Sequence, residues 1–97
     1  MEILKMYGFL NDKNKVVNNH FVVNGTNNKV GLFVIFKSYD TNMCIYLLDY
    51  SKMIVNTTKY SNTTSKYRNM FIDSINHKKL VEFDEAEFNN YYNNWIK

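Results

Sequence analysis

The chain has 97 residues, a net charge of +3 and 45% hydrophobic residues, which predict one folded domain, residues 1–97. Aromatic residues make up 16% of the chain and supply apolar area for a core, so the composition excludes an intrinsically disordered protein. It also excludes a disulfide-stabilised scaffold, because the single cysteine, Cys44, has no second cysteine to pair with.

The first half of the chain predicts strands, because runs of β-branched and aromatic residues alternate with polar turn clusters. Asn24-Gly25 is expected to form a tight turn between two of them, since both residue types tolerate positive φ. Turn signals recur about every ten residues, which is typical of an antiparallel meander. The expected strands are Glu2–Leu10, Val16–Asn24, Lys29–Lys37 and Met43–Asp49, with Lys52–Thr57 as a candidate fifth.

The second half changes to a helical period. Tyr67, Met70, Phe71 and Ile75 recur at helical spacing and predict a helix over about 64–77. Residues 80–83 are compatible with a short strand or an extended connection.

The last element is predicted as a helix over about 85–96. Asp84 and Glu87 have the spacing of a capping box at its start. Apolar residues then recur on one face, and this face places Trp95 toward the core; its members are Phe88, Tyr91, Tyr92, Trp95 and Ile96.

Together these elements predict an α+β domain. We expect an antiparallel sheet of four to five strands over about residues 2–57, followed by the two helices, 64–77 and 85–96, packed on one face of the sheet.

The composition also bears on source and location. Phe, Tyr, Ile, Asn and Lys supply 49 residues, and AT-rich codons encode these types, so we expect an AT-rich genome such as that of a low-GC bacterium, its phages or plasmids, or a protist. No run approaches about 18 apolar residues, so no membrane contact is expected. Residues 1–10 carry Glu2 and Lys5, unlike a signal peptide, and one unpaired cysteine fits the cytoplasm.

Catalytic and metal-binding signals are weak. Cys44 lies in an apolar run and is expected to be a buried strand residue, while His20 and His77 lie far from it in sequence. No cysteine–histidine set has zinc-ligand spacing, and the three glycines form no phosphate-binding loop. We therefore predict a protein that is not an enzyme and uses no cofactor or metal; a small enzyme using Cys44 is the second alternative.

Positive charge is concentrated in residues 51–81, where six basic residues face one acid, whereas residues 82–97 hold four acids and one lysine. Lysine and arginine beside tyrosine can bind a phosphate backbone and stack a base. Nucleic-acid binding by segment 52–79 is thus the first alternative function. Its candidate residues are Lys52, Lys59, Tyr60, Lys66, Tyr67, Arg68, Lys78 and Lys79.

The leading prediction is a small protein-binding protein. Fifteen aromatic residues exceed the need of so small a core, so some are expected at the surface, where tyrosine and tryptophan anchor interfaces. A phage or mobile-element accessory protein that binds and inhibits a host protein, such as a defence or replication factor, fits this description. A homodimer through an edge strand or the last helix is a further option. The predicted partner-binding residues are Tyr39, Tyr50, Tyr91 and Tyr92.

Overall fold

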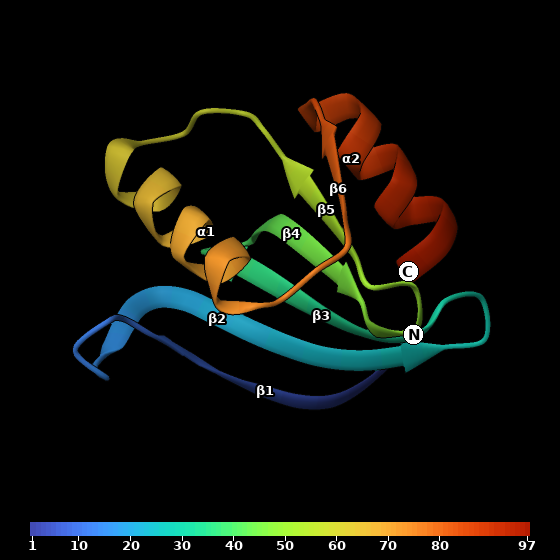
Figure 1. The fold of residues 1–97 in the computed structure, drawn as a ribbon, viewed down its shortest axis with the longest axis horizontal. Helices are drawn as coiled ribbons and strands as arrows, with labels where there is room; N and C mark the ends of the chain where they lie inside the picture. The colour runs from blue at the N-terminus through green and yellow to red at the C-terminus, as the bar shows by residue number, and fades with distance from the viewer.

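The computed structural model describes all 97 residues as a twisted sheet with two helices. Figure 1 shows the helices over opposite ends of the sheet. The strands are β1 (Glu2–Leu10), β2 (Val16–Asn27), β3 (Gly31–Ser38), β4 (Thr41–Leu47), β5 (Lys52–Asn56) and β6 (Lys79–Phe83). The helices are α1 (Asn62–Ser74) and α2 (Glu85–Tyr91), with a 3-10 turn η1 (Leu48–Tyr50) and a π-helix η2 (Tyr92–Ile96).

The predicted α+β class is confirmed, but the predicted sheet is wrong in two respects. The sheet has six strands in the order β1-β2-β3-β4-β5-β6, and it is mixed, because β6 pairs in parallel with β5. Parallel neighbours need a long crossover connection, and α1 supplies it between β5 and β6. The remaining pairs are antiparallel, as the meander predicts.

The two helices cover opposite faces of the sheet, so the prediction that both pack on one face is wrong. Successive strand residues point to opposite faces, and Val22 and Val23 accordingly belong to different core clusters. Phe71 of α1 packs in the cluster with Val22, whereas Phe88 of α2 packs in the cluster with Val23. The sheet is therefore buried on both sides.

The turn between β2 and β3 lies three residues beyond the predicted Asn24-Gly25 turn. Strand β2 runs on to Asn27, and Gly31, with φ of +77°, ends the turn. Gly25 has a packing role instead, because a Cβ there would lie 2.6 Å from Cζ of Phe33. Asn27 makes the turn with its side chain: Oδ1 accepts hydrogen bonds from the main-chain N–H of Lys29 and Val30.

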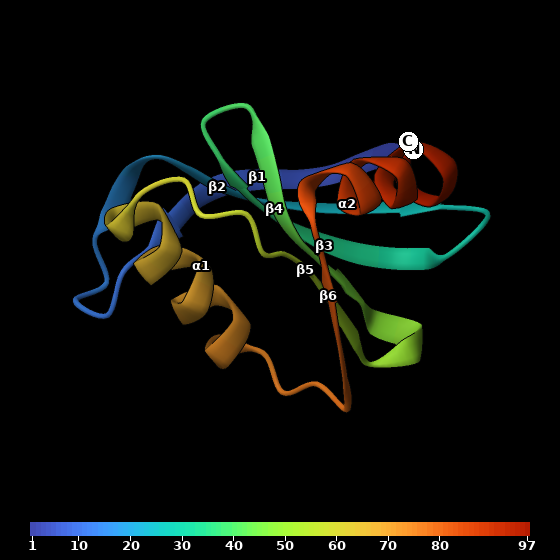
Figure 2. The ribbon, with the colours of Figure 1, turned by 90° about the horizontal axis from the view of Figure 1, so that it is seen from above.

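The last helix begins as predicted and ends differently. Asp84 and Glu87 form a capping box, each side chain accepting a hydrogen bond from the other's main-chain N–H. The α-helix then stops at Tyr91, and a π-helical turn completes the chain. Figures 1 and 2 both show the two chain ends close together at one end of the sheet. No helix combines the length and the apolar character that crossing a membrane requires.

Candidate functional site

The best candidate for a functional site is a surface hollow that we call the aromatic–lysine pocket. Its rim carries three aromatic side chains, Tyr50, Tyr91 and Trp95, and two lysines, Lys29 and Lys52. Its floor is formed by Val30 and Leu47, and its volume is about 260 Å³. Six segments of the chain meet at this pocket: the β2–β3 turn, the end of β4, η1, the start of β5, α2 and η2.

Two tight turns bring the rim together. Gly31 follows the β2–β3 turn, and a Cβ there would lie 2.5 Å from Oδ2 of Asp49 in η1, so only glycine lets these turns approach so closely. Ser51 follows η1 with a left-handed φ of 48° and turns the chain into β5. The turn residues therefore place Tyr50 beside the β2–β3 turn.

The π-helical turn directs Trp95 outward. The main-chain N–H of Lys97 donates to the carbonyl of Tyr92, five residues back, in place of the usual four. This changes the helical phase: Ile96 is fully buried, while Trp95 is 48% exposed. The prediction that Trp95 faces the core is therefore wrong, because that prediction assumed a regular α-helix to the end of the chain.

The rings lie close enough to form one aromatic surface. The ring centroids of Tyr91 and Trp95 are 6.3 Å apart, and their planes differ by 30°. Burial, and after it the neighbouring Tyr50, raises the pKa of Tyr91 above its ordinary value. The phenol is protonated at physiological pH, as that of an ordinary tyrosine also is, and can donate a hydrogen bond at the rim of an apolar hollow.

Lysines give the rim a positive charge. Lys29 extends toward η2, where its Nζ donates to the main-chain oxygen of Asn94 at 2.7 Å. Lys52 is the register partner of Lys79 in the parallel pair β5–β6. The main-chain N–H groups of Lys78 and Lys79 both donate to the carbonyl of Ser51. The main chains of three lysines from the predicted basic segment thus lie near Ser51, the residue that follows Tyr50.

The other residues of that basic segment lie at the opposite, carboxyl end of β5. Arg68 is held inside the fold, where Nη1 donates to the carbonyls of Asn56 and Thr58 at 2.9 and 3.0 Å. Tyr60 donates to Glu85, and burial raises the pKa of its phenol, which the hydrogen bond with Asn56 lowers in part and the contact with Glu85 raises further. Tyr67 packs against the core ring of Phe9, leaving Lys59 and Lys66 as the exposed cations at this end. Residues 52–79 therefore form two separate groups.

The four predicted partner-binding tyrosines are also divided. Tyr50 and Tyr91 meet in the aromatic–lysine pocket. Tyr39 is exposed at the β3–β4 turn, at the other end of β3, with a positive φ of 53°. Tyr92, at the start of η2, packs against the core cluster that contains Phe88. Lys29 and Trp95 were not among the predicted site residues. Asn27, a turn-forming residue close to Lys29, is the local signal that could have indicated the β2–β3 turn as part of the site.

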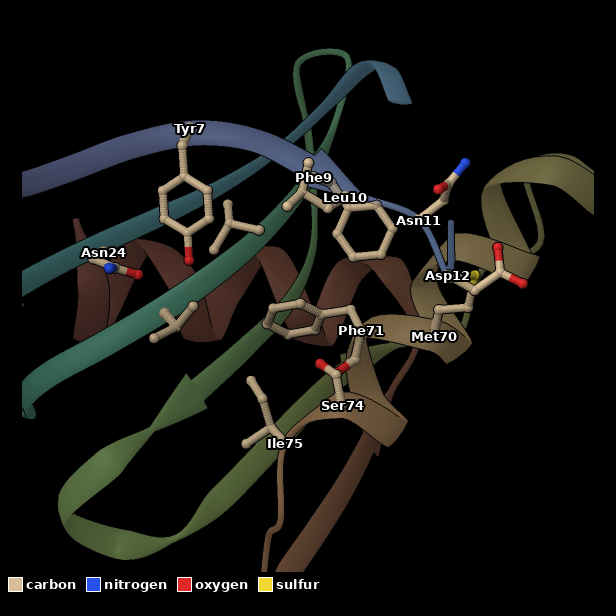
Figure 3. A pocket seen from close by; sticks show the side chains of 12 residues that line it. Tyr7, Phe9, Leu10, Asn11, Asp12, Asn24, Met70, Phe71, Ser74 and Ile75 are labelled. Atoms are coloured by element: carbon tan, nitrogen blue, oxygen red, sulfur yellow. The ribbon is translucent and has the colours of Figure 1, made fainter. Parts of the chain in front are cut away.

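A second cavity, the β1–α1 groove, lies on the opposite face of the sheet. It has a volume of about 520 Å³ and is mostly apolar. Figure 3 shows Tyr7 projecting from β1 into it, across from Phe71 and Ile75 at the end of α1. The side-chain Oδ1 of Asn24 is buried there without a hydrogen-bond partner. The groove contains one charged residue, Asp12, and so offers mainly apolar contact.

Cys44 is hydrogen-bonded to neither histidine. Its side chain is fully buried in a strand, and burial raises the pKa of the thiol strongly, which disfavours the nucleophilic thiolate. His20 is bound to the carbonyl of Asn18 and to Ser38 Oγ, and His77 to the carbonyl of Ile75. No three side chains of His, Cys, Asp or Glu cluster in an arrangement that could hold a metal ion.

Comparison with known proteins gives a family without an assigned activity. The sequence profile of a family of unknown function (DUF8033) matches residues 3–90. No curated protein and no solved structure matches the chain. The matched region includes Lys29, Tyr50 and Lys52 and ends immediately before Tyr91.

Proposed function

This chain belongs to the family of unknown function DUF8033, and we propose that it is a non-enzymatic protein-binding module whose contact surface is the aromatic–lysine pocket. The observation that carries the proposal is the exposure of Trp95 and Tyr50, 48% and 56%, around one hollow. Tryptophan and tyrosine dominate the binding energy of protein interfaces, where they pack around a partner's side chain.

The composition of the rim defines the chemistry of the partner. The floor is aliphatic, so it accepts an apolar or aromatic side chain. Lys29 and Lys52 flank that position and attract carboxylates through complementary charge. A partner segment that carries one large apolar residue with neighbouring acidic residues satisfies both requirements.

Inhibition of a host protein is the form of action that we propose for this binding. A small module without its own chemistry acts by covering a functional surface of its partner. In the setting that the AT-rich composition suggests, a phage or mobile element, that partner is a host defence or replication factor.

The test uses matched aromatic variants. Wild-type protein, Trp95→Ala and Tyr39→Ala serve as baits in host lysate, and the captured protein is then purified and titrated by calorimetry. We expect Trp95→Ala to weaken binding at least about tenfold, as at an interface hot spot. Tyr39 is an exposed ring outside the pocket, so its removal should leave affinity unchanged. Equal affinity of both variants would refute the proposal.

Single-stranded nucleic acid is the second candidate ligand, because Lys52 lines the pocket with Tyr50, and the main chains of Lys78 and Lys79 bind the adjacent Ser51. Exposed rings stack bases and lysines hold phosphates in such sites. Trp95 is the only tryptophan, so its fluorescence reports directly on the pocket. If the pocket binds nucleic acid, an oligonucleotide should quench this fluorescence, and its affinity should fall steeply as the salt concentration rises. In the double variant Lys52→Gln/Lys79→Gln, the affinity should depend less steeply on salt. Unchanged fluorescence at low salt would remove this candidate.

A further inference from the structure

Strand β1 is an edge strand with an apolar surface. It has nine residues and pairs only with β2, so its outer side presents unpaired main-chain N–H and C=O groups. Five of its large apolar side chains are 41–55% exposed: Ile3, Leu4, Met6, Tyr7 and Leu10. An edge of this length and character can template the addition of another strand.

The opposite edge of the sheet lacks these features. Strand β6 has five residues, two of them charged, Lys79 and Glu82. Short strands and charged side chains are the devices by which proteins protect sheet edges from pairing. Strand β1 also has two charged residues, Glu2 and Lys5, but they are spread over nine residues, and its two register irregularities lie on either side of a regular stretch from Lys5 to Gly8. That central stretch remains available as a template.

We infer that β1 pairs antiparallel with β1 of a second copy of this chain, so that two sheets join into one across a two-fold axis at Met6. Met6 is the midpoint of Glu2–Leu10, so a two-fold axis at Met6 places the full length of one β1 strand opposite the other. It also avoids like charges, because Lys5 then lies opposite Tyr7 of the second copy and not opposite its own equivalent.

Lys5 and Tyr7 already interact within one copy. Lys5 Nζ lies 5.2 Å from the centroid of the Tyr7 ring, a cation–π distance. The two-fold axis places a second Lys5–Tyr7 pair directly beside the first, on the same face of the sheet. The paired strands thus bring two lysines and two rings into an alternating arrangement.

Pairing at β1 also completes the β1–α1 groove. Directly opposed residues of antiparallel strands point to the same face, so both copies' α1 helices lie on one side of the joined sheet. Tyr7 and Leu10 line the groove from β1 (Figure 3), and the two grooves therefore meet at the junction. The dimer covers the exposed side of β1 without using the aromatic–lysine pocket, whose lining contains no residue of β1.

A disulfide test locates the axis. Residues opposed on antiparallel strands have Cα atoms about 4.5–5.5 Å apart, within the range that a disulfide requires. We expect Met6→Cys to form a covalent dimer on mild oxidation, whereas Leu80→Cys, in the other edge strand, stays monomeric. The native Cys44 is fully buried and does not compete.

A charge test measures the affinity. Wild-type protein should sediment at twice the monomer mass of 11.6 kDa as its concentration rises. Met6→Lys opposes two lysines at the axis and should raise the dissociation constant at least about tenfold. Leu80→Lys is the matched control, since Leu80 and Met6 are 48% and 52% exposed. Two results would overturn the inference. In the first, the wild-type protein stays monomeric and Met6→Cys does not cross-link. In the second, Leu80→Lys abolishes the dimer and Met6→Lys does not.

Discussion

The side-chain amide of Asn27 donates hydrogen bonds to the main-chain oxygens of Trp95, at 2.7 Å, and Ile96, at 3.0 Å. The Oδ1 atom of the same amide accepts from the N–H groups of Lys29 and Val30. One side chain thus folds the β2–β3 turn and binds carbonyls that the end of a helix would otherwise leave unsatisfied. This link joins residues 68 positions apart and fixes one side of the aromatic–lysine pocket.

Replacing Asn27 with alanine removes all four of these hydrogen bonds. We expect Asn27→Ala to lower the free energy of unfolding by about 2–3 kcal/mol, given the usual net contribution of each bond. Asn28 is the adjacent asparagine and makes no side-chain hydrogen bond, so Asn28→Ala should stay within about 0.5 kcal/mol of wild type. Urea denaturation of the three proteins measures both values. Equal loss in both variants would show that the link does not stabilise the fold.

Trp95 and Phe88 provide a test of how the last helix is oriented. Trp95 is half exposed, so Trp95→Ala should cost about 1–1.5 kcal/mol, roughly half the value of burying a large apolar side chain. Phe88 is fully buried, and Phe88→Ala should cost about 3–5 kcal/mol. Thermal and urea unfolding give both numbers. A larger cost at Trp95 than at Phe88 would contradict the outward orientation that the π-helical turn produces.

Most elements of this fold are local and could be predicted, whereas their arrangement depends on contacts that are distant in sequence. The strands of the first half and the capping box at Asp84 follow from short-range patterns. The side on which each helix packs does not. One signal was nevertheless present: Phe33, Val34, Ile35 and Phe36 form a continuous apolar run, as expected of a strand covered on both faces.

The candidate site was less predictable than the fold. Tyr50 and Tyr91 were identified as surface aromatics, but their meeting depends on η1 and α2 packing at the same end of the sheet. The outward position of Trp95 required a π-helical turn, which shifts the phase of an otherwise regular apolar pattern. The hydrogen bonds from Asn27 and Lys29 to that turn connect distant segments, and no local pattern encodes them.

Arg68 was predicted as a nucleic-acid contact, and its position instead supports a structural test. Its guanidinium bridges the carbonyls of Asn56 and Thr58, which joins α1 to the end of β5. Hydrogen bonds from charged donors are stronger than neutral ones, so Arg68→Met should cost about 2–3 kcal/mol. Lys59 is exposed at the same end and makes no hydrogen bond, so Lys59→Met should change stability by less than about 0.5 kcal/mol. Equal urea midpoints for the two variants would contradict this role.

Cys44 should make the stability of the fold depend on alkaline pH. Burial raises the pKa of its thiol, and the positive charge of Arg68 offsets this only in part. The folded state therefore keeps the proton, while the unfolded state releases it near the ordinary value of 9.0. The contribution of the protonated thiol to the free energy of unfolding is thus complete below that pH. It is lost as pH rises above that value, by up to about 1.4 kcal/mol per pH unit.

The difference between wild type and Cys44→Ala isolates this contribution. Tyr60 and Tyr91 also have raised pKa values, but they are present in both proteins and cancel in the difference. Cys44→Ala should be less stable at neutral pH, because a buried side chain is truncated. The two unfolding free energies, measured by urea denaturation, should then converge as pH rises from about 8.5 to about 10. Parallel curves over that range would show that the thiol does not retain its proton in the folded protein.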